Sequence, residues 1–341
     1  MNRNDFISGK VAKEKMINWG IVGTGHVASK FADTVYQMKD ETKVYAVASR
    51  SAQRAHDFAV LHHVEVSYDQ YEQMLTDPQV DAVYIAVPNH LHCAYAVAAM
   101  EAGKHVLCEK PMGMNAEQTQ HMIDVAYDHN VFLMENMVPR FLPITHEVRE
   151  WVNEGDIGEV RFIEGHFGIA AQGYPDSRWF NKDLGGGALL DVGIYPISYA
   201  TMILGYDVEK VQTMAYIGET GVDEHHSVTL SYRGGRRLAS LSASVVANSG
   251  SGIIISGEYG KIVVDGFTNA HKATLEKNFE APVKVRVPNE INGFEYVIRE
   301  VLHCLEEKDL ESPRLPWVVT LENMRLLDRV RGMWGLHYPC E

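Results

Sequence analysis

Short apolar runs alternate with stretches of helical spacing along the first 140 residues. The apolar runs are WGIVG, VYAVAS, AVYIAVP, HVLCEKP and VFLMEN, and the intervening stretches include 26–38, 90–102 and 115–129. Asn115 fits an N-cap for the last of these helices, with Gln118 three residues later as in a capping box. Strands that alternate with helices predict a parallel, doubly wound sheet.

The pattern changes after Pro139 and Pro143. From about residue 158 the chain shows strand-like runs at close intervals, interrupted by one apolar segment at 187–204 that suits a helix. Mostly antiparallel pairing is the simplest interpretation of these runs. The segments 293–306 and 317–332 again have helical spacing and are expected to close the molecule. We therefore predict a polar extension over 1–15, a dinucleotide-binding domain over 16–138 and an α+β domain over 139–341.

Composition narrows the classes of protein and of partner. The chain has 341 residues, 46% of them hydrophobic, and this is enough to bury the cores of two domains. A formal net charge of -14 without a basic cluster argues against nucleic acid or an anionic membrane as a partner. The polar N-terminus does not resemble a secretory signal, so we expect a cytoplasmic location. Four widely spaced cysteines predict reduced thiols rather than disulfides or a zinc site.

A glycine-rich turn follows the first apolar run. Residues 23–28 fit the pattern G-x-G-x-x-A, in which Gly23 makes the tight turn, Gly25 admits a pyrophosphate and Ala28 lets helix and strand pack closely. Its position between the first strand and the first helix favours dinucleotide binding over an ordinary turn. The expected phosphate contacts are Gly23, Thr24, Gly25, His26 and Val27.

The end of the second strand indicates which dinucleotide is bound. A carboxylate there would bond the ribose 2′-hydroxyl of NAD, whereas this strand ends in Ala48, Ser49 and Arg50. A guanidinium and a hydroxyl suit the 2′-phosphate of NADP. We therefore expect NADP, with NAD as the alternative if Arg50 is only a solvated loop residue.

The sequence resembles the glucose-fructose oxidoreductase, inositol dehydrogenase and MocA (Gfo/Idh/MocA) family. The shared motifs are the glycine turn, VASRS at 47–51, AVPNHLH at 86–92, CEKP at 108–111 and GGGALLDVGIYP at 185–196, and they cover nearly the whole chain from Met16. SR after the second strand makes the chain most similar to the NADP-dependent dihydrodiol and xylose dehydrogenase branch. The resemblance implies a Rossmann domain, then a large, open, mostly antiparallel sheet that lines the substrate pocket and forms a homodimer contact.

The resemblance also places the family's active lysine on Lys110. Lys110 follows a predicted strand, at the sheet edge where open α/β folds bind ligands, and Glu109 precedes it. An ammonium there would stabilise a developing alkoxide, or it would lose its proton if burial lowers its pKa. A solvated lysine is the alternative for this residue type.

Asp191 and Tyr195 complete the expected catalytic group. Their spacing puts both on one face of a helix over 187–204, where we expect Tyr195 to exchange a proton and Asp191 to orient a hydroxyl or Lys110. We expect an adjacent ammonium to favour the Tyr195 phenolate. The alternative is a core tyrosine and a turn-forming aspartate. Inositol dehydrogenase relatives carry histidine at this point, so Tyr195 puts an inositol substrate in doubt.

Other residues are placed by the resemblance alone. Val87, Pro88, Asn89 and His92 pass along the cofactor, together with Glu109 and Lys110, while Arg140 and Trp179 join Asp191 and Tyr195 at the substrate. Trp179 precedes Phe180, where related enzymes often have arginine. The pairs His62-His63 and His225-His226 lack further ligands, so we expect no metal.

These observations predict an NADP-dependent oxidoreductase. It would move a hydride between nicotinamide and an alcohol carbon of a sugar, trans-diol or cyclic polyol. An NAD-dependent inositol-type dehydrogenase and a non-catalytic dinucleotide-sensing regulator are the alternatives. Retention of Lys110 and Tyr195 argues against the regulator, because a sensor needs no proton transfer.

Overall fold

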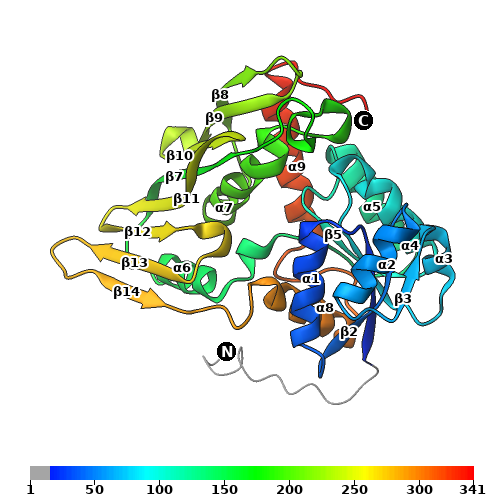
Figure 1. Cartoon of the computed structure of the whole chain (residues 1–341). Helices are drawn as coiled ribbons and strands as arrows, with labels where there is room; N and C mark the ends of the chain where they lie inside the picture. Colours follow the sequence, from blue (N-terminus) through cyan, green and yellow to red (C-terminus); the bar gives the residue numbers. More distant parts are fainter. Residues whose placement is uncertain (1–15) are drawn as a thin grey trace.

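The N-terminal half contains a six-stranded parallel sheet in a computed structural model that describes residues 16–341 (Figure 1). The predicted extension over 1–15 lies outside the described residues. The strand order is β3-β2-β1-β4-β5-β6. The bounds are β1 Ile17–Val22, β2 Thr42–Ala48, β3 Val66–Tyr68, β4 Ala82–Ile85, β5 His105–Glu109 and β6 Leu133–Asn136. The order reverses between β1 and β4, which is the point where doubly wound folds bind their ligands. The predicted Rossmann sheet is confirmed.

Helices connect these strands as expected. They are α1 His26–Gln37, α2 Ala52–Leu61, α3 Tyr71–Thr76, α4 His92–Glu101 and α5 Ala116–Asp128. The predicted cap of α5 is present, because the Asn115 side chain accepts the Gln118 N–H at 2.8 Å. Gln118 departs from a capping box, since its Oε1 accepts the N–H of Met114 at 3.1 Å instead of that of Asn115.

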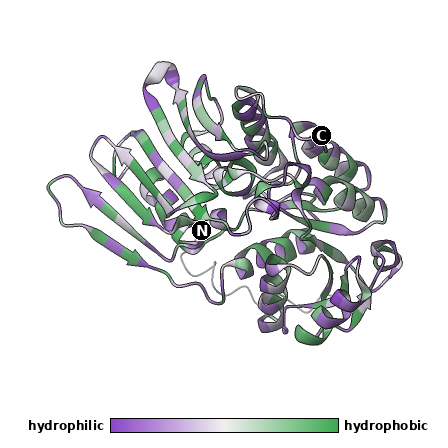
Figure 2. Ribbon diagram, turned by 45° about the horizontal axis from the view of Figure 1, so that its top comes forward, coloured by the Kyte–Doolittle hydropathy of each residue, from purple (hydrophilic) through white to green (hydrophobic). Residues whose placement is uncertain are grey.

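The C-terminal half is built on an eight-stranded sheet of order β14-β13-β12-β11-β7-β10-β9-β8. Its strands are β7 Val160–Ala170, β8 Lys210–Ile217, β9 Asp223–Tyr232, β10 Arg237–Ser244, β11 Val246–Gly257, β12 Gly260–Asp265, β13 Lys272–Lys277 and β14 Val283–Arg286. Among the described strands of this eight-stranded sheet only the β7–β10 pair is parallel, so the mostly antiparallel sheet is confirmed. Hydrophobic and hydrophilic residues alternate along these strands (Figure 2), as expected when one face is buried and the other open.

Four further helices surround the sheets. They are α6 Pro143–Asn153, α7 Ile194–Leu204, α8 Phe294–Glu307 and α9 Trp317–Gly332. Helix α6 was not predicted from the sequence. Pro143 occupies its first turn, where the missing N–H of proline costs no hydrogen bond within the helix. Helix α9 packs against α5 and α7, and α8 packs against α1, so the C-terminal helices bridge both halves. The boundary near residue 138 stays a prediction.

The helix predicted over 187–204 is present but begins irregularly. A π-helical turn spans Leu189–Gly193 and leads directly into α7. The wider segment Lys182–Leu204 is long and apolar enough to cross a membrane by length and composition, but 83% of its most apolar window is buried inside the protein. Burial of this kind is what a core helix requires. A π-helical turn often marks a functional site.

Candidate functional site

The glycine-rich turn leaves open space at the start of α1. Gly23 has φ +105°, and a Cβ there would lie 2.3 Å from the carbonyl oxygen of Ala86, so only glycine fits. A Cβ on Gly25 would meet nothing within 4 Å, and Gly25 is the N-cap of α1. Thr24 lies between these glycines, His26 and Val27 are exposed in the first turn, and Ala28 is buried. The residues therefore fit a pyrophosphate bound at a helix N-terminus.

Ser49 and Arg50 lie beside this turn. The N–H of Gly23 donates to the Ala48 carbonyl at 3.0 Å, which places the end of β2 directly against the glycine turn. Ser49 is half-buried and Arg50 is exposed. Within residues 16–341, no hydrogen bond or ion pair engages the Arg50 guanidinium. Its donors are thus free to meet an anion on a cofactor.

The loop after β4 contains four of the expected cofactor contacts. Val87 and Pro88 are half-buried, and the Asn89 amide donates to the Gly185 carbonyl at 3.2 Å. His92 is buried, with Nδ1 2.8 Å from the Pro111 carbonyl oxygen and Nε2 2.9 Å from that of Val87. Burial lowers the pKa of His92 to about 4, so the ring is neutral and donates to only one of the two carbonyls. His92 therefore joins two loops of the protein, and neither ring nitrogen is turned toward a ligand.

Lys110, Asp191 and Tyr195 converge as the sequence predicted. The Lys110 side chain is 11% exposed, and its Nζ donates to the Asp191 carbonyl oxygen at 2.7 Å. The same Nζ lies 3.7 Å from Asp191 Oδ1 and 5.1 Å from the centre of the Tyr195 ring. Burial lowers the pKa of Lys110, against the opposing effect of the Asp191 and Glu109 carboxylates. These contacts bring Lys110, which follows β5 of the parallel sheet, together with Asp191 and Tyr195 from the π-helical turn and α7.

Asp191 is held by a second cation. Its side chain is 1% exposed, and both carboxylate oxygens accept from Arg178 Nη1, at 2.9 and 3.1 Å. The Arg178 guanidinium also lies 3.9 Å from the centre of the half-buried Trp179 ring. Asp191 thus joins the lysine at the end of β5 to an arginine at the mouth of the site.

The Tyr195 phenol is not in the ionised state expected from the sequence. Burial raises the pKa of Tyr195 above its ordinary range, and the carboxylates of Glu109 and Asp191 raise it further. The sequence argument counted only the adjacent ammonium, whose effect is outweighed. The phenol is therefore protonated at neutral pH and suits a proton donor.

Glu109 and Arg140 point into the protein. Glu109 Oε1 accepts from the Tyr84 hydroxyl and, at 2.6 Å, from the Asn136 amide. Arg140 donates from Nη1 to the Ser198 carbonyl at 3.3 Å, on α7. The contacts expected for them with cofactor and substrate are thus replaced by contacts within the protein, which the local sequence does not reveal.

The glycine run before Asp191 positions the π-helical turn. A Cβ on Gly186 would lie 2.5 Å from the Arg178 carbonyl oxygen, and one on Gly187 would lie 2.4 Å from Asp223 Oδ1. Asp223 Oδ2 accepts the N–H of Leu189 at 2.8 Å and lies 3.0 Å from His226 Nδ1. This buried acid–histidine pair was not predicted, although its two residues are only three apart, because its contact with Leu189 joins segments 34 residues apart along the chain.

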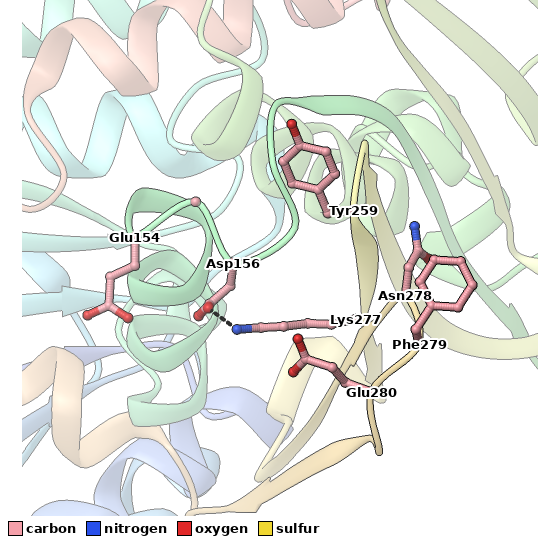
Figure 3. A pocket seen from close by; sticks show the side chains of 8 residues that line it. Glu154, Asp156, Tyr259, Lys277, Asn278, Phe279 and Glu280 are labelled. Atoms are coloured by element: carbon pink, nitrogen blue, oxygen red, sulfur yellow. Dashed lines mark hydrogen bonds and ion pairs between the residues drawn. The ribbon is translucent and has the colours of Figure 1, made fainter.

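The histidine pairs do not form a metal site. In residues 16–341 no group of three or more metal-binding side chains comes together. His62 contacts Asp33 at 2.8 Å, whereas His226 contacts Asp223 and His225 stacks on Tyr216. A cavity of about 420 Å³ at the edge of the larger sheet (Figure 3) contains none of the expected site residues. It is lined by Glu154, Gly155, Asp156, Tyr259, Lys277, Asn278, Phe279 and Glu280, with Lys277 paired to Asp156.

A parallel sheet with a dinucleotide turn, and a buried lysine beside an aspartate and a tyrosine, define a nicotinamide-dependent oxidoreductase. Comparison with known proteins agrees. Residues 17–137 match the oxidoreductase family with an NAD-binding Rossmann fold, and residues 145–263 match the Gfo/Idh/MocA C-terminal domain. The chain belongs to the Gfo/Idh/MocA oxidoreductase family.

Individual relatives match over almost their whole length. Trans-1,2-dihydrobenzene-1,2-diol dehydrogenase of Xenopus laevis is 33% identical over 329 residues, covering 94% of this chain and 99% of the relative. The enzyme of the same name from Danio rerio is 34% identical over 330 residues, covering 94% and 98%. The crystal structure of a 3-ketoreductase from Actinomadura kijaniata with NADP and TDP-benzene gives a TM-score of 0.85 at 29% identity, covering 93% and 97%.

Proposed function

We propose that this protein is an NADP-dependent oxidoreductase that moves a hydride between nicotinamide and an alcohol carbon of a trans-diol, sugar or cyclic polyol. The observation that carries the proposal is the convergence of Lys110, Asp191 and Tyr195 at the end of β5, on the sheet edge that also carries the dinucleotide turn after β1. The relatives named as diol dehydrogenases and as a 3-ketoreductase support this substrate class. The glycine turn and Arg50 support NADP.

The chain's own residues would handle the proton. Bound nicotinamide supplies the hydride acceptor or donor. In the reducing direction, the protonated Tyr195 hydroxyl donates to the oxygen that becomes the alcohol, while the Lys110 ammonium stabilises negative charge on that oxygen. In the oxidising direction the alcohol proton returns by the same route. Asp191 holds Lys110 in place, and Arg178 and Trp179 border the substrate side.

A substrate screen tests the function. Purified protein would be incubated with NADP⁺ and with NAD⁺ and a panel of trans-diols, pentoses, hexoses and inositols, and absorbance of reduced cofactor would be followed. We expect turnover with NADP⁺ and a diol or sugar. Turnover only with NAD⁺ and an inositol would favour the inositol-type alternative. Tight NADP⁺ binding without turnover in either direction would favour the sensing regulator.

Arg50→Ala is expected to weaken NADP⁺ binding by about 10- to 100-fold, because a charge-assisted hydrogen bond to the 2′-phosphate is lost. NAD⁺ binding should change little. Quenching of tryptophan fluorescence during titration with each cofactor measures both affinities. Arg236→Ala removes another exposed arginine, in the turn between β9 and β10, and serves as the control. Equal loss of NAD⁺ and NADP⁺ affinity would remove Arg50 from the phosphate site.

A homodimer through the larger sheet is also proposed. Gly165 of β7 faces Pro196 of α7, so the alternate residues lie on the face away from α7. Phe162, Leu238, Ile254 and Val263 are half-buried on that outer face. An apolar strip of this kind favours contact with a second copy.

Ile254→Glu is expected to convert the dimer to a monomer of about 38.2 kDa, because a charge would be buried in the contact. Sedimentation velocity measures the mass. Val60→Glu alters another apolar residue, 64% exposed on α2, and should leave the dimer intact. A wild-type protein that sediments as a monomer would refute the dimer.

A cytoplasmic location without nucleic-acid or membrane partners is proposed as well. The net charge of -14 supports this, because it disfavours polyanions and anionic lipid surfaces. All four cysteines are free, as reducing compartments maintain them.

A further inference from the structure

One peptide group next to Lys110 has a buried side chain at each end. The carbonyl oxygen of the Pro111–Met112 peptide lies 2.8 Å from His92 Nδ1, and its N–H donates to Glu135 Oε1 at 3.0 Å. His92 begins α4 and Glu135 lies in β6, so the two contacts come from opposite sides of the loop after β5. The backbone that follows Lys110 cannot turn without breaking one of them.

Glu135 is a costly residue for this contact. Its side chain is buried, with the residue 2% exposed, and Oε2 has no hydrogen-bond partner among the described residues. An amide oxygen would accept the same N–H without the cost of burying a carboxylate. Burial raises the pKa of Glu135 to about 7, which leaves the group able to ionise near neutral pH. A buried ionisable side chain in a site of this kind usually has a role beyond packing.

The charges around Glu135 are those of the site. Lys110 and Arg140 favour its carboxylate, and Glu109 opposes it. The carboxylate in turn disfavours ionisation of the Cys108 thiol and the Tyr195 phenol. Glu135 therefore influences the charge of both Lys110 and Tyr195. Within residues 16–341, no hydrogen bond joins Glu135 to either side chain.

We propose that Glu135 is a positioning residue, whose carboxylate fixes the loop after β5 through the Met112 N–H and stabilises the Lys110 ammonium between Asp191 and Tyr195. The effect on turnover rests on the proposed function. The effect on Lys110 itself does not. His92 holds the other end of the same peptide group.

Two substitutions separate the hydrogen bond from the charge. Glu135→Gln keeps an oxygen acceptor for the Met112 N–H and removes the charge, whereas Glu135→Ala removes both. Glu295→Ala is the matched control, because Glu295 is also fully buried and accepts the backbone N–H groups of Ile291, Asn292 and Gly293, at the start of α8. It should lower thermal stability and leave the site unaltered.

The first readout is the titration of Lys110, followed by NMR after reductive ¹³C-methylation of the full-length protein and assigned with Lys110→Met. We expect both Glu135 variants to lower the Lys110 midpoint by about half a unit or more, because a nearby negative charge is lost. Glu295→Ala should match the wild type. Equal Lys110 midpoints in all four proteins would overturn the proposal, whether or not any substrate is turned over.

The second readout is turnover with the substrate found in the screen. Glu135→Ala is expected to lower kcat by on the order of 100-fold with little change in KM, because Lys110 is displaced. Glu135→Gln should recover about tenfold of that loss. Wild-type kcat should rise with pH through about 7, as Glu135 ionises, and Glu135→Gln should lack that step. Equal losses in the Gln and Ala variants, or an unchanged pH step, would count against positioning. Absence of turnover in the wild type would instead refute the proposed function.

Discussion

Lys110→Met lowers kcat by about 1,000-fold while NADP⁺ affinity stays within about threefold of the wild type; this is the result we expect from the proposed role of the ammonium. Met fills a similar volume but cannot donate to the Asp191 carbonyl or meet charge on the substrate oxygen. Asp191 keeps its contacts with Arg178, so the site is not left with an unpaired buried carboxylate. Steady-state kinetics and fluorescence titration of NADP⁺ measure the two quantities.

Lys104→Met is the matched control for this substitution. Lys104 is also buried, and its Nζ donates to the carbonyl oxygens of Asp77 and Val80 at 2.8 Å each. Its loss should reduce stability without a comparable fall in kcat. If Lys110→Met kept more than about a tenth of wild-type turnover, the lysine would not stabilise the transition state.

The sequence predicted the frame of the site well, for identifiable reasons. The motif could be recognised from adjacent residues alone, since Gly23 has φ +105° directly after β1 and Gly25 directly precedes α1. The alternation of β1, α1 and β2 likewise depends on short-range patterns of apolar residues. Helix α6 was missed because a proline in the first turn resembles a helix breaker in sequence alone.

Side-chain directions within the site were harder to predict. His92 and Glu109 lie in motifs that implied cofactor contacts, but His92 contacts backbone carbonyls and Glu109 contacts Tyr84 and Asn136. Glu135 gave no signal, because a carboxylate at the end of an apolar strand usually faces solvent. These side-chain directions depend on how β5 and β6 pair and on which helices cover them. Neither the pairing nor the covering helices can be predicted from neighbouring residues in the sequence.

The same limitation explains the error over the Tyr195 phenol. The sequence-based expectation weighed only the Lys110 ammonium, although it also placed Asp191 on the same helix face as Tyr195. The fold adds burial and the carboxylates of Glu109 and Asp191, which together favour the protonated phenol. The hydroxyl is therefore a donor at rest, and its role can be separated from that of the ring.

Tyr195→Phe is expected to lower kcat by about 100- to 1,000-fold, because the ring remains and only the proton-carrying hydroxyl is lost. The contact between Lys110 Nζ and the ring face, 5.1 Å from the ring centre, and the edge contact with Phe167 should both persist. NADP⁺ affinity should therefore change little, and the Lys110 titration should stay near that of the wild type.

Tyr199→Phe is the control, since Tyr199 lies one turn further along α7, where it is buried and packed against Phe267. The Tyr199 hydroxyl makes no contact with Lys110 or Asp191 within residues 16–341. We therefore expect kcat of this variant to stay within about threefold of the wild type. A Tyr195→Phe variant with nearly full turnover would show that the ring serves only to hold the ammonium. Proton transfer would then fall to Lys110 alone, and the rate would follow the titration of its amine, whose pKa burial lowers.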